Sequence, residues 1–277
     1  MTLLELRKEP HLSASAIADY LECGLSFRFS RIDCLRPEYK ADSLEFGSCI
    51  HLALADFHQE RMIGTVMTKQ ELEQRFVYHW QLRAKENPEL RFKPDNTYEN
   101  LLERGQALLR VYHDNYFDEN LTVLAIEEPF RFTLKGMPLP LIGAMDLVEE
   151  DDRGEIIITD FKTAAKSYSD DDVRKNFQLM VYHLAAKANG YHDRKINLVI
   201  DCLVKTKSPQ FKRYCTTKDQ LDERRATKKI VEVWHGIAQG VFIPNDTSWK
   251  CKDCSYRQAC ADWHDQEEAY GPSAAVK

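Results

Sequence analysis

The sequence predicts an α/β protein with a mixed central sheet flanked by helices. Two apolar runs, residues 141–148 and 155–161, flank the acidic turn 149–154, which is typical of a β-hairpin with a longer loop. The Ile-, Val- and Leu-rich segment 194–204 indicates a further strand. Helix-forming segments alternate with these strands, and this alternation favours a sheet covered by helices.

Composition places the chain among ordinary globular proteins, with 43% hydrophobic and 30% charged residues in a length of 277. One large domain or two small ones can bury a core of this size. No apolar run approaches the roughly 18 residues that span a bilayer, and the charged residues 1–10 do not resemble a secretory signal. We therefore expect a cytoplasmic protein without membrane contact. The net charge of -6 does not exclude nucleic acid, because a local cationic groove can bind phosphates.

Charged side chains interrupt the predicted hairpin. Asp146 lies within the first run, Asp160 lies near the end of the second, and Lys162 follows two positions later. Since side chains alternate faces along a strand, Asp160 and Lys162 point the same way, and Asp146 can project beside them. Such a set can hold a hard divalent cation and activate water. The alternative is three solvent-exposed charges at strand ends.

The strand predicted over residues 121–135 carries two further acids, Glu127 and Glu128. We interpret both as solvated residues at the edge of the sheet and leave them out of the site. The preceding segment, residues 60–118, is predicted to be helical, with a capping box at Thr68-x-x-Glu71. It is expected to form a helical lobe over one side of the cleft.

Two other predicted helices present polar residues one turn apart, Gly47 with His51 and Gln178 with Tyr182. A lone helical histidine is ordinarily a surface or core residue, and a tyrosine beside a polar residue is ordinarily buried. A neutral imidazole can also join two carboxylates on a divalent metal, with Mn2+ suiting it better than Mg2+.

Three of the eight cysteines form the compact set Cys251-x2-Cys254-x5-Cys260, which has the spacing of a metal or cluster site. Two fourth ligands are available. His264 would complete a local zinc site, whereas Cys23, at the other end of the chain, would complete a four-thiolate site suited to iron and sulfur. The alternative for Cys23 is a small buried hydrophobe.

A basic segment follows the predicted strand 194–204 and includes Lys205, Lys207, Lys212 and Arg213 together with two aromatic residues. This composition suits a groove that tracks phosphates and stacks bases. An exposed hairpin tip explains the same composition.

Taken in order, these motifs resemble the PD-(D/E)xK nuclease superfamily. Gly143-x-x-Asp146 and Asp160-Phe161-Lys162 match its two acidic motifs. The Gly47-x3-His51 and Gln178-x3-Tyr182 pairs are similar to motifs of its RecB-like families. The resemblance covers most of the chain outside about residues 60–118, and it implies a restriction-endonuclease-like core.

The cysteines resemble those of the iron–sulfur subset of RecB-like nucleases, which includes the CRISPR-associated RecB-like exonucleases, the AddB nuclease domain and related phage exonucleases. This likeness implies a 4Fe-4S cluster, with zinc at the triplet and His264 as the alternative. The four implied cluster ligands are Cys23, Cys251, Cys254 and Cys260. The implied organisation is one nuclease domain over residues 1–277, with a helical insertion at 60–118 and an iron–sulfur lobe from residues 11–35 and 245–265.

The resemblance also implies roles at the acidic site. His51, Asp146, Asp160 and the carbonyl of Phe161 would bind Mg2+ or Mn2+, and Lys162 would stabilise the attacking or developing oxyanion. Gln178 and Tyr182 would hold the substrate strand and help to position the lysine. The expected role of the whole set is hydrolysis of phosphodiester bonds.

We therefore expect a divalent-metal-dependent DNA exonuclease or end-trimming nuclease that prefers single-stranded DNA, in repair, recombination or CRISPR adaptation. A helicase or a CRISPR integrase is the expected protein partner. Two alternatives stay open at this point. One is a non-cleaving, DNA-binding accessory subunit of a helicase or integrase complex, and the other is a zinc-stapled domain without nuclease activity.

Overall fold

The computed structural model describes residues 1–116 and 121–265, and the chain forms two compact units. The larger unit contains Met1–Ala14 and Lys40–Val231, and the smaller contains Ser15–Tyr39 and the segment from Glu232 onward. Among the described residues, no helix combines the length and the apolar character needed to cross a bilayer. The two units are taken separately below.

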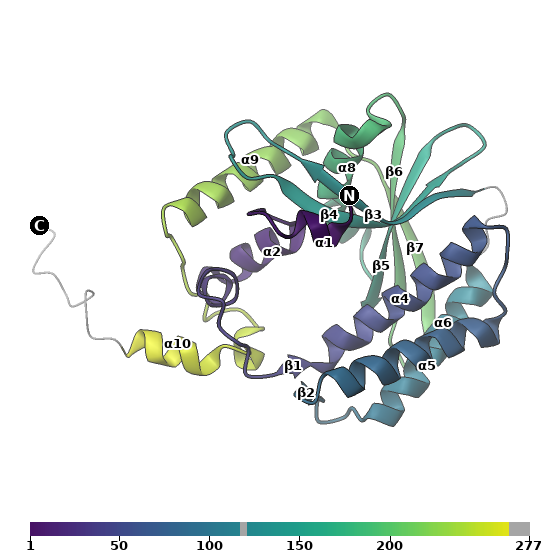
Figure 1. The fold of residues 1–277 in the computed structure, drawn as a ribbon, viewed down its shortest axis with the longest axis horizontal. Helices are drawn as coiled ribbons and strands as arrows, with labels where there is room; N and C mark the ends of the chain where they lie inside the picture. The colour runs from purple at the N-terminus through teal and green to yellow at the C-terminus, as the bar shows by residue number, and fades with distance from the viewer. Residues whose placement is uncertain (117–120, 266–277) are drawn as a thin grey trace, which may run out of the picture. The chain divides into compact units, whose positions relative to one another are not determined.

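The larger unit is built on a five-stranded sheet in the order β3-β4-β5-β6-β7 (Figure 1). The pair β5–β6 is parallel and the other pairs are antiparallel. The sheet is therefore mixed, and the predicted fold class is confirmed. The strands span Thr122–Phe132 (β3), Leu141–Glu150 (β4), Ile156–Ala164 (β5), Ile196–Val204 (β6) and Gln210–Thr216 (β7).

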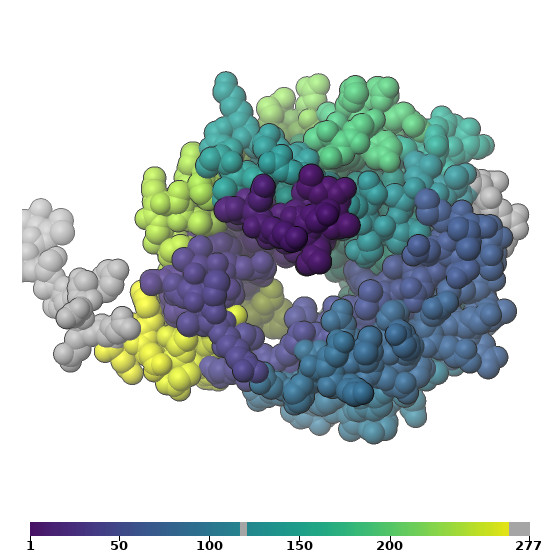
Figure 2. Space-filling model, in the orientation of Figure 1, coloured from purple at the N-terminus to yellow at the C-terminus, as the bar shows by residue number. Residues whose placement is uncertain are grey.

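Helices cover both faces of this sheet. Three long helices, α4, α5 and α6, lie on one side, and α8 lies on the other (Figure 1). Figure 2 shows α4 and α5, in blue, packed together at the surface. The helices span Leu3–Leu6 (α1), Asp42–Met62 (α4), Lys69–Glu86 (α5), Tyr98–Asn115 (α6), Asp170–Arg174 (α7), Phe177–Ala186 (α8) and Gln220–Ala238 (α9). Two short strands, Lys40–Ala41 (β1) and Leu90–Arg91 (β2), pair in parallel beside them.

The ends of the inserted helices follow from local sequence. The Thr68 hydroxyl accepts from the Glu71 amide and the Glu71 carboxylate accepts from the Thr68 amide, so the predicted capping box begins α5. Thr97 caps α6 in the same way. Helix α6 ends at Asn115. Phe117, near the end of the predicted helical segment 60–118, lies outside the described residues.

The helical layer has a dense aromatic core. Phe76 and Trp80 of α5 are fully buried and stack with ring centroids 6.3 Å apart. Gly105 lets α6 approach them, because a Cβ there would stand 2.1 Å from the Phe76 ring. These apolar contacts join α5 to α6, together with the ion pair of Arg110 with Glu73 and the hydrogen bond from Trp80 Nε1 to the Tyr98 carbonyl.

The sheet divides where the acidic motifs lie. Strands β4 and β5 pair only between Leu147–Glu150 and Ile156–Thr159. Beyond that point β4 continues its pairing with β3, while β5 continues with β6 as far as Ala164 and Val204. The two strands therefore separate just past Leu147 and Thr159. Asp146 and Asp160 are the first residues beyond the paired segment, at the fork.

The smaller unit brings two distant segments together. Its first segment contains most of α2 (Ala14–Glu22), α3 (Gly24–Phe27) and the turn Arg28–Ile32, and its second contains the turn Cys251–Asp253 and α10 (Arg257–His264). The Tyr20 hydroxyl donates to the Val241 carbonyl at 2.6 Å. At Gly24 a Cβ would stand 2.7 Å from the Ile243 amide nitrogen, so only glycine permits this approach.

Candidate active site

The fork in the sheet presents a backbone amide to the first acid. Because β5 has left β4, the Phe161 N–H has no ladder partner on that side and donates to Asp146 Oδ2 at 2.9 Å. Asp146 is buried, with 7% of its surface exposed. The backbone of the Asp-x-Lys strand thus orients the acid of the neighbouring strand.

Asp160 and Lys162 project from the same face of β5, as strand alternation predicts. The Lys162 ammonium donates to Asp160 Oδ1 at 2.8 Å and lies equally close to Oδ2. Asp160 is fully buried, and its Oδ2 accepts no hydrogen bond from the described residues. A buried carboxylate oxygen with spare capacity faces this site.

Helix α8 connects the lysine to the first acid through a chain of hydrogen bonds. Lys162 Nζ donates to Gln178 Oε1 at 3.0 Å, which fixes the orientation of the amide because lysine can only donate. Gln178 Nε2 then donates to the Tyr182 hydroxyl at 2.9 Å, and this hydroxyl donates to Asp146 Oδ1 at 3.1 Å. The i, i+4 spacing of Gln178 and Tyr182 makes the relay possible.

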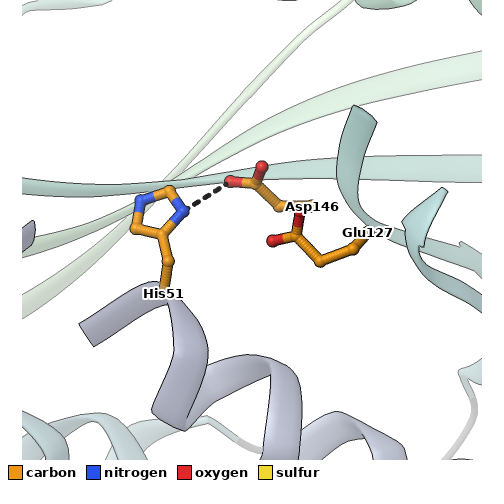
Figure 3. Close-up of side chains that lie close together, drawn as sticks. All are labelled: His51, Glu127 and Asp146. Carbon is orange, nitrogen blue, oxygen red and sulfur yellow. Dashed lines mark ion pairs between the residues drawn. The ribbon is translucent and has the colours of Figure 1, made fainter. Parts of the chain in front are cut away.

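His51 reaches the same acid from α4. Its Nδ1 lies 3.3 Å from Asp146 Oδ2 (Figure 3). Its ring and the Phe161 ring are nearly perpendicular, with centroids 5.9 Å apart. The structure therefore brings together all six side chains that the motifs single out. They are His51, Asp146, Asp160, Lys162, Gln178 and Tyr182.

Glu127 is a site residue that the sequence interpretation left in solvent. One ligand atom each of His51, Glu127 and Asp146 lie within 4.8 Å of one another, and the side chains point toward a common centre (Figure 3). Glu127 has a positive φ of 49° between the paired residues Ile126 and Glu128. A residue-by-residue register for β3 and β4 would have placed it opposite Asp146.

The acids at the fork influence one another. The surrounding protein atoms, and then the charge of Asp146, raise the pKa of Glu127 to about 7. Glu127 as a whole is exposed, and its carboxylate lies close to that of Asp146. Burial raises the pKa of Asp160, with Lys162 opposing the shift and Asp146 adding to it.

Lys162 keeps its positive charge at this site. Burial acts to lower its pKa, but the adjacent Asp160 outweighs burial and the net shift is upward. An ammonium group that stays protonated can stabilise a developing negative charge, whereas it cannot take up a proton. The Lys162 ammonium group is therefore a fixed positive charge, held between Asp160 and Gln178.

Gly143 of the first acidic motif has a packing role. It pairs with Phe130 across β3 and β4, and a Cβ at Gly143 would stand 2.5 Å from that ring. The Phe130 ring in turn meets the edge of Tyr182 at 6.1 Å. The glycine therefore makes room for the aromatic residue that packs on Tyr182.

The four cysteines singled out by spacing line one cavity of about 690 Å³ in the smaller unit, together with His264. Burial, and then the neighbouring thiols of Cys23, Cys251 and Cys254, raise the pKa of Cys260. The sequence places these groups at the two ends of the chain, and the fold gathers them. All eight cysteines carry free thiols.

The basic residues after β6 differ in their surroundings. Lys207 and Lys212 are exposed, and the Lys205 ammonium lies 5.3 Å above the Phe46 ring. Arg213 makes two hydrogen bonds of 2.7 Å to the buried Asp201 and covers the Tyr116 ring. Its guanidinium is committed to the protein, so we leave Arg213 out of the proposals below.

The mixed sheet and the acids at the fork of β4 and β5 form a candidate metal-binding site. The family model of the PD-(D/E)XK nuclease superfamily matches residues 11–261, and the chain belongs to that superfamily. Nucleases of this superfamily use divalent metals.

Two solved structures resemble the chain. One, named "Putative exonuclease" from Eubacterium rectale, has a TM-score of 0.54 and 18% identity, over 97% of this chain and 92% of that one. The other, named SSO0001, has a TM-score of 0.38 and 15% identity, over 94% and 92% of the two chains, and carries no argument. The first likeness shows the fold. No curated protein matches the chain.

Proposed function

We propose that the protein is a divalent-metal-dependent DNA exonuclease or end-trimming nuclease that prefers single-stranded DNA. The observation that carries the proposal is the convergence of His51, Asp146, Asp160 and Lys162 at the fork of β4 and β5. The name of the Eubacterium rectale structure, "Putative exonuclease", supports action at strand ends. Such trimming would serve repair, recombination or CRISPR adaptation, with a helicase or an integrase as partner.

The donor set at the fork fits a divalent cation. An imidazole and carboxylate oxygens within 4.8 Å of one another suit Mn2+ or Mg2+, and Asp160 Oδ2, which faces the Lys162 ammonium, has a lone pair for another contact. His51, Glu127, Asp146, Asp160 and the carbonyl of Phe161 would hold the ion. The ion would polarise a phosphoryl oxygen and make water more acidic.

The protein's own groups would then act on the phosphodiester. The Lys162 ammonium would neutralise charge that develops on an oxygen at phosphorus, because it stays protonated beside Asp160. Gln178 would keep the ammonium in place, and Tyr182 would keep Asp146 Oδ1 oriented. Each of these groups is positioned before DNA binds, so little reorganisation accompanies the reaction.

We further propose that the cavity of the smaller unit holds a 4Fe-4S cluster. Four thiols line this cavity, and soft thiolates favour iron–sulfur clusters or zinc. The alternative is Zn2+ on Cys251, Cys254, Cys260 and His264, since His264 lines the same cavity. The role expected of the cluster is to fasten the two segments of this unit together.

End-labelled linear DNA and circular single-stranded DNA test the nuclease. The wild type with Mg2+ or Mn2+ is expected to shorten linear single strands, to leave circles intact and to stop when EDTA is added. Asp160→Ala and Lys162→Ala should each lower the rate on the order of 10²–10³-fold. Asp152→Ala, which removes an exposed acid of the β4–β5 turn, is the matched control.

Equal rates in the wild type and both active-site variants would overturn the proposal. Binding of DNA with metal but without cleavage would instead select a non-cleaving accessory subunit. Cleavage of circular single-stranded DNA would support a nuclease but would show that it does not need a DNA end.

A further inference from the structure

Three positively charged side chains outside the candidate active site lie near the start of α4, those of Lys93, Arg104 and Lys205. Asp42, fully buried, accepts hydrogen bonds at Oδ2 from the Lys93 backbone amide at 3.0 Å and from the Asn96 side chain at 2.6 Å. Arg104 of α6 donates to Asn96 Oδ1 at 3.4 Å. The loop before α6 is therefore fastened to the beginning of α4 through the Lys93 backbone and Asn96, and Arg104 of α6 is bonded to that loop.

The third cation comes from the sheet. The Lys205 backbone amide donates to the Ala164 carbonyl at 2.7 Å, so Lys205 stands beside the end of β5, the strand that carries Asp160 and Lys162. Its ammonium covers the ring of Phe46, four residues after Asp42 on α4. Burial, and then the positive charges of Lys93 and Arg104, lower the pKa of Lys205, while Asp42 opposes the shift.

The three positive charges are not balanced within the protein. Among residues 1–116 and 121–265, Lys93, Arg104 and Lys205 form no ion pair, whereas the buried or half-buried Arg61, Lys162 and Arg213 each face a carboxylate. Asp42 supplies one negative charge for three positive ones. Like charges held together repel, so an anion at this place would relieve the repulsion.

Helix α4 connects this cluster to the catalytic centre. The Phe46 ring lies under the Lys205 ammonium, and His51, five residues later on the same helix, lies 3.3 Å from Asp146 Oδ2. Lys205 directly follows Val204, the last residue of β6, which pairs with Ala164 at the end of β5. A Cβ at Gly47 would meet only the Thr163 hydroxyl oxygen, at 3.7 Å, so no bulky side chain stands in front of the helix here.

We propose that Lys93, Arg104 and Lys205 bind the backbone phosphates of a single DNA strand next to the phosphate that is cleaved. The site would extend the catalytic centre along the first turns of α4 and would give the inserted helix α6 a part in substrate binding. This inference rests on the proposed nuclease function. It specifies where the single DNA strand lies on the protein. Cation contacts to phosphate, rather than to bases, would make the binding independent of sequence.

Binding without cleavage gives the first test. A fluorescein-labelled oligothymidylate is titrated with protein in EDTA at several salt concentrations, and the slope of log K against log salt is measured. The triple variant Lys93→Gln, Arg104→Gln, Lys205→Gln should lower the slope by about 2, since each lost contact to a single strand removes about 0.7. The matched control is Lys69→Gln, Lys175→Gln, Lys195→Gln, whose ammonium groups already face carboxylates.

Modified oligonucleotides separate internal phosphates from a terminal one. Uncharged methylphosphonate linkages beside the cleavage position should weaken binding of the wild type and leave the triple variant unaffected. Removal of the 5′-phosphate should affect neither protein. If the triple variant loses only a preference for a 5′-phosphate, the cluster reads a strand end and the proposal is wrong.

The outcomes distinguish this inference from the nuclease proposal. A wild type that cleaves with metal, together with a triple variant of unchanged salt slope and unchanged melting temperature, overturns the inference alone. A wild type that binds oligonucleotide with the expected slope but never cleaves overturns the nuclease and leaves the phosphate site standing. A wild type that does not bind DNA overturns both.

Discussion

The Asp146 carboxylate is held from three directions, by the Phe161 amide, the Tyr182 hydroxyl and the His51 ring. Each partner belongs to a different element, namely β5, α8 and α4. A carboxylate fixed in this way presents its oxygens to a ligand without a search among rotamers. At the scale of one residue, the precision of the site depends on neighbours that do not need to touch the substrate.

Tyr182→Phe tests that dependence. The change keeps the ring that packs against Phe130 but removes the hydrogen bonds to Gln178 and Asp146. Activity should fall about 10–100-fold, and stability should fall by about 1 kcal/mol. Tyr214→Phe removes a hydroxyl outside the relay and is the control. Wild-type rates in Tyr182→Phe would show that the relay is dispensable.

His58 is a buried histidine that stays neutral. Arg61 donates to its Nδ1 at 2.9 Å, so the proton resides on Nε2, which donates to the Tyr112 hydroxyl at 2.8 Å. Burial, and then the charges of Arg61 and Arg213, hold its pKa well below 6.5. The folded protein therefore binds one proton fewer than the unfolded chain when the pH is below 6.5.

Stability should follow this difference. As the pH falls below about 6.5, the unfolded chain takes up the His58 proton and the folded chain does not, so the free energy of unfolding decreases by up to about 1.4 kcal/mol per pH unit. Urea titrations between pH 5 and 7 measure the slope. His58→Gln should flatten it, while the exposed control His192→Gln should not. A steep slope retained in His58→Gln would assign the titration to another group.

At the scale of elements, the close packing of Gly105 against Phe76 contributes to the contact between α5 and α6. Gly105→Ala would place a methyl group in the Phe76 ring and should destabilise the protein by about 1–3 kcal/mol. Glu103→Ala, at an exposed position of the same helix, should change stability by less than about 0.5 kcal/mol. Chemical denaturation measures both. Equal stability of the two variants would mean that the helices separate easily.

The elements also show what the sequence could and could not predict. The hairpin around Asp146 and Asp160 and the capping box at Thr68 follow from local patterns, and the structure contains both. The place of Glu127 does not, because it depends on a left-handed backbone at one residue and on the register of β3 against β4. The sequence alone does not distinguish an acid that points into solvent from one that points toward the site.

Local sequence patterns also do not predict the fork between β4 and β5. Periodicity indicates that β4 and β5 are strands, but the extent of their pairing is set by β3 and β6, which pull them apart. The commitment of Arg213 to Asp201 is likewise a tertiary fact, since an arginine in a basic segment reads as a phosphate ligand until its partner is known. Motif spacing predicts residues that the structure brings together at the fork, and the topology decides their neighbours.

At the scale of the whole molecule, the cysteines are gathered from both ends of the chain into the smaller unit. Closing so long a loop by a cluster restricts the unfolded chain strongly. Cys23→Ser should abolish iron content and visible absorption and remove the unfolding transition of the smaller unit. Calorimetry and an iron assay on anaerobically purified protein check this, with the exposed Cys215→Ser as control.

Zinc would give a different pattern. If metal analysis finds zinc, if Cys23→Ser retains it and if His264→Ala loses it, the alternative set of Cys251, Cys254, Cys260 and His264 replaces the cluster. Full stability and full iron content in Cys23→Ser would remove Cys23 from either site.

The parallel pairing of β5 with β6 has a consequence for synthesis of the protein. The catalytic strand ends at Ala164, yet the neighbour that draws it away from β4 begins only at Ile196, after α7 and α8 have been made. A nascent chain on the ribosome that stops short of Ile196 has every acid and the lysine but lacks the strand that spreads them. Truncated products would therefore lack the arrangement on which the proposed cleavage depends.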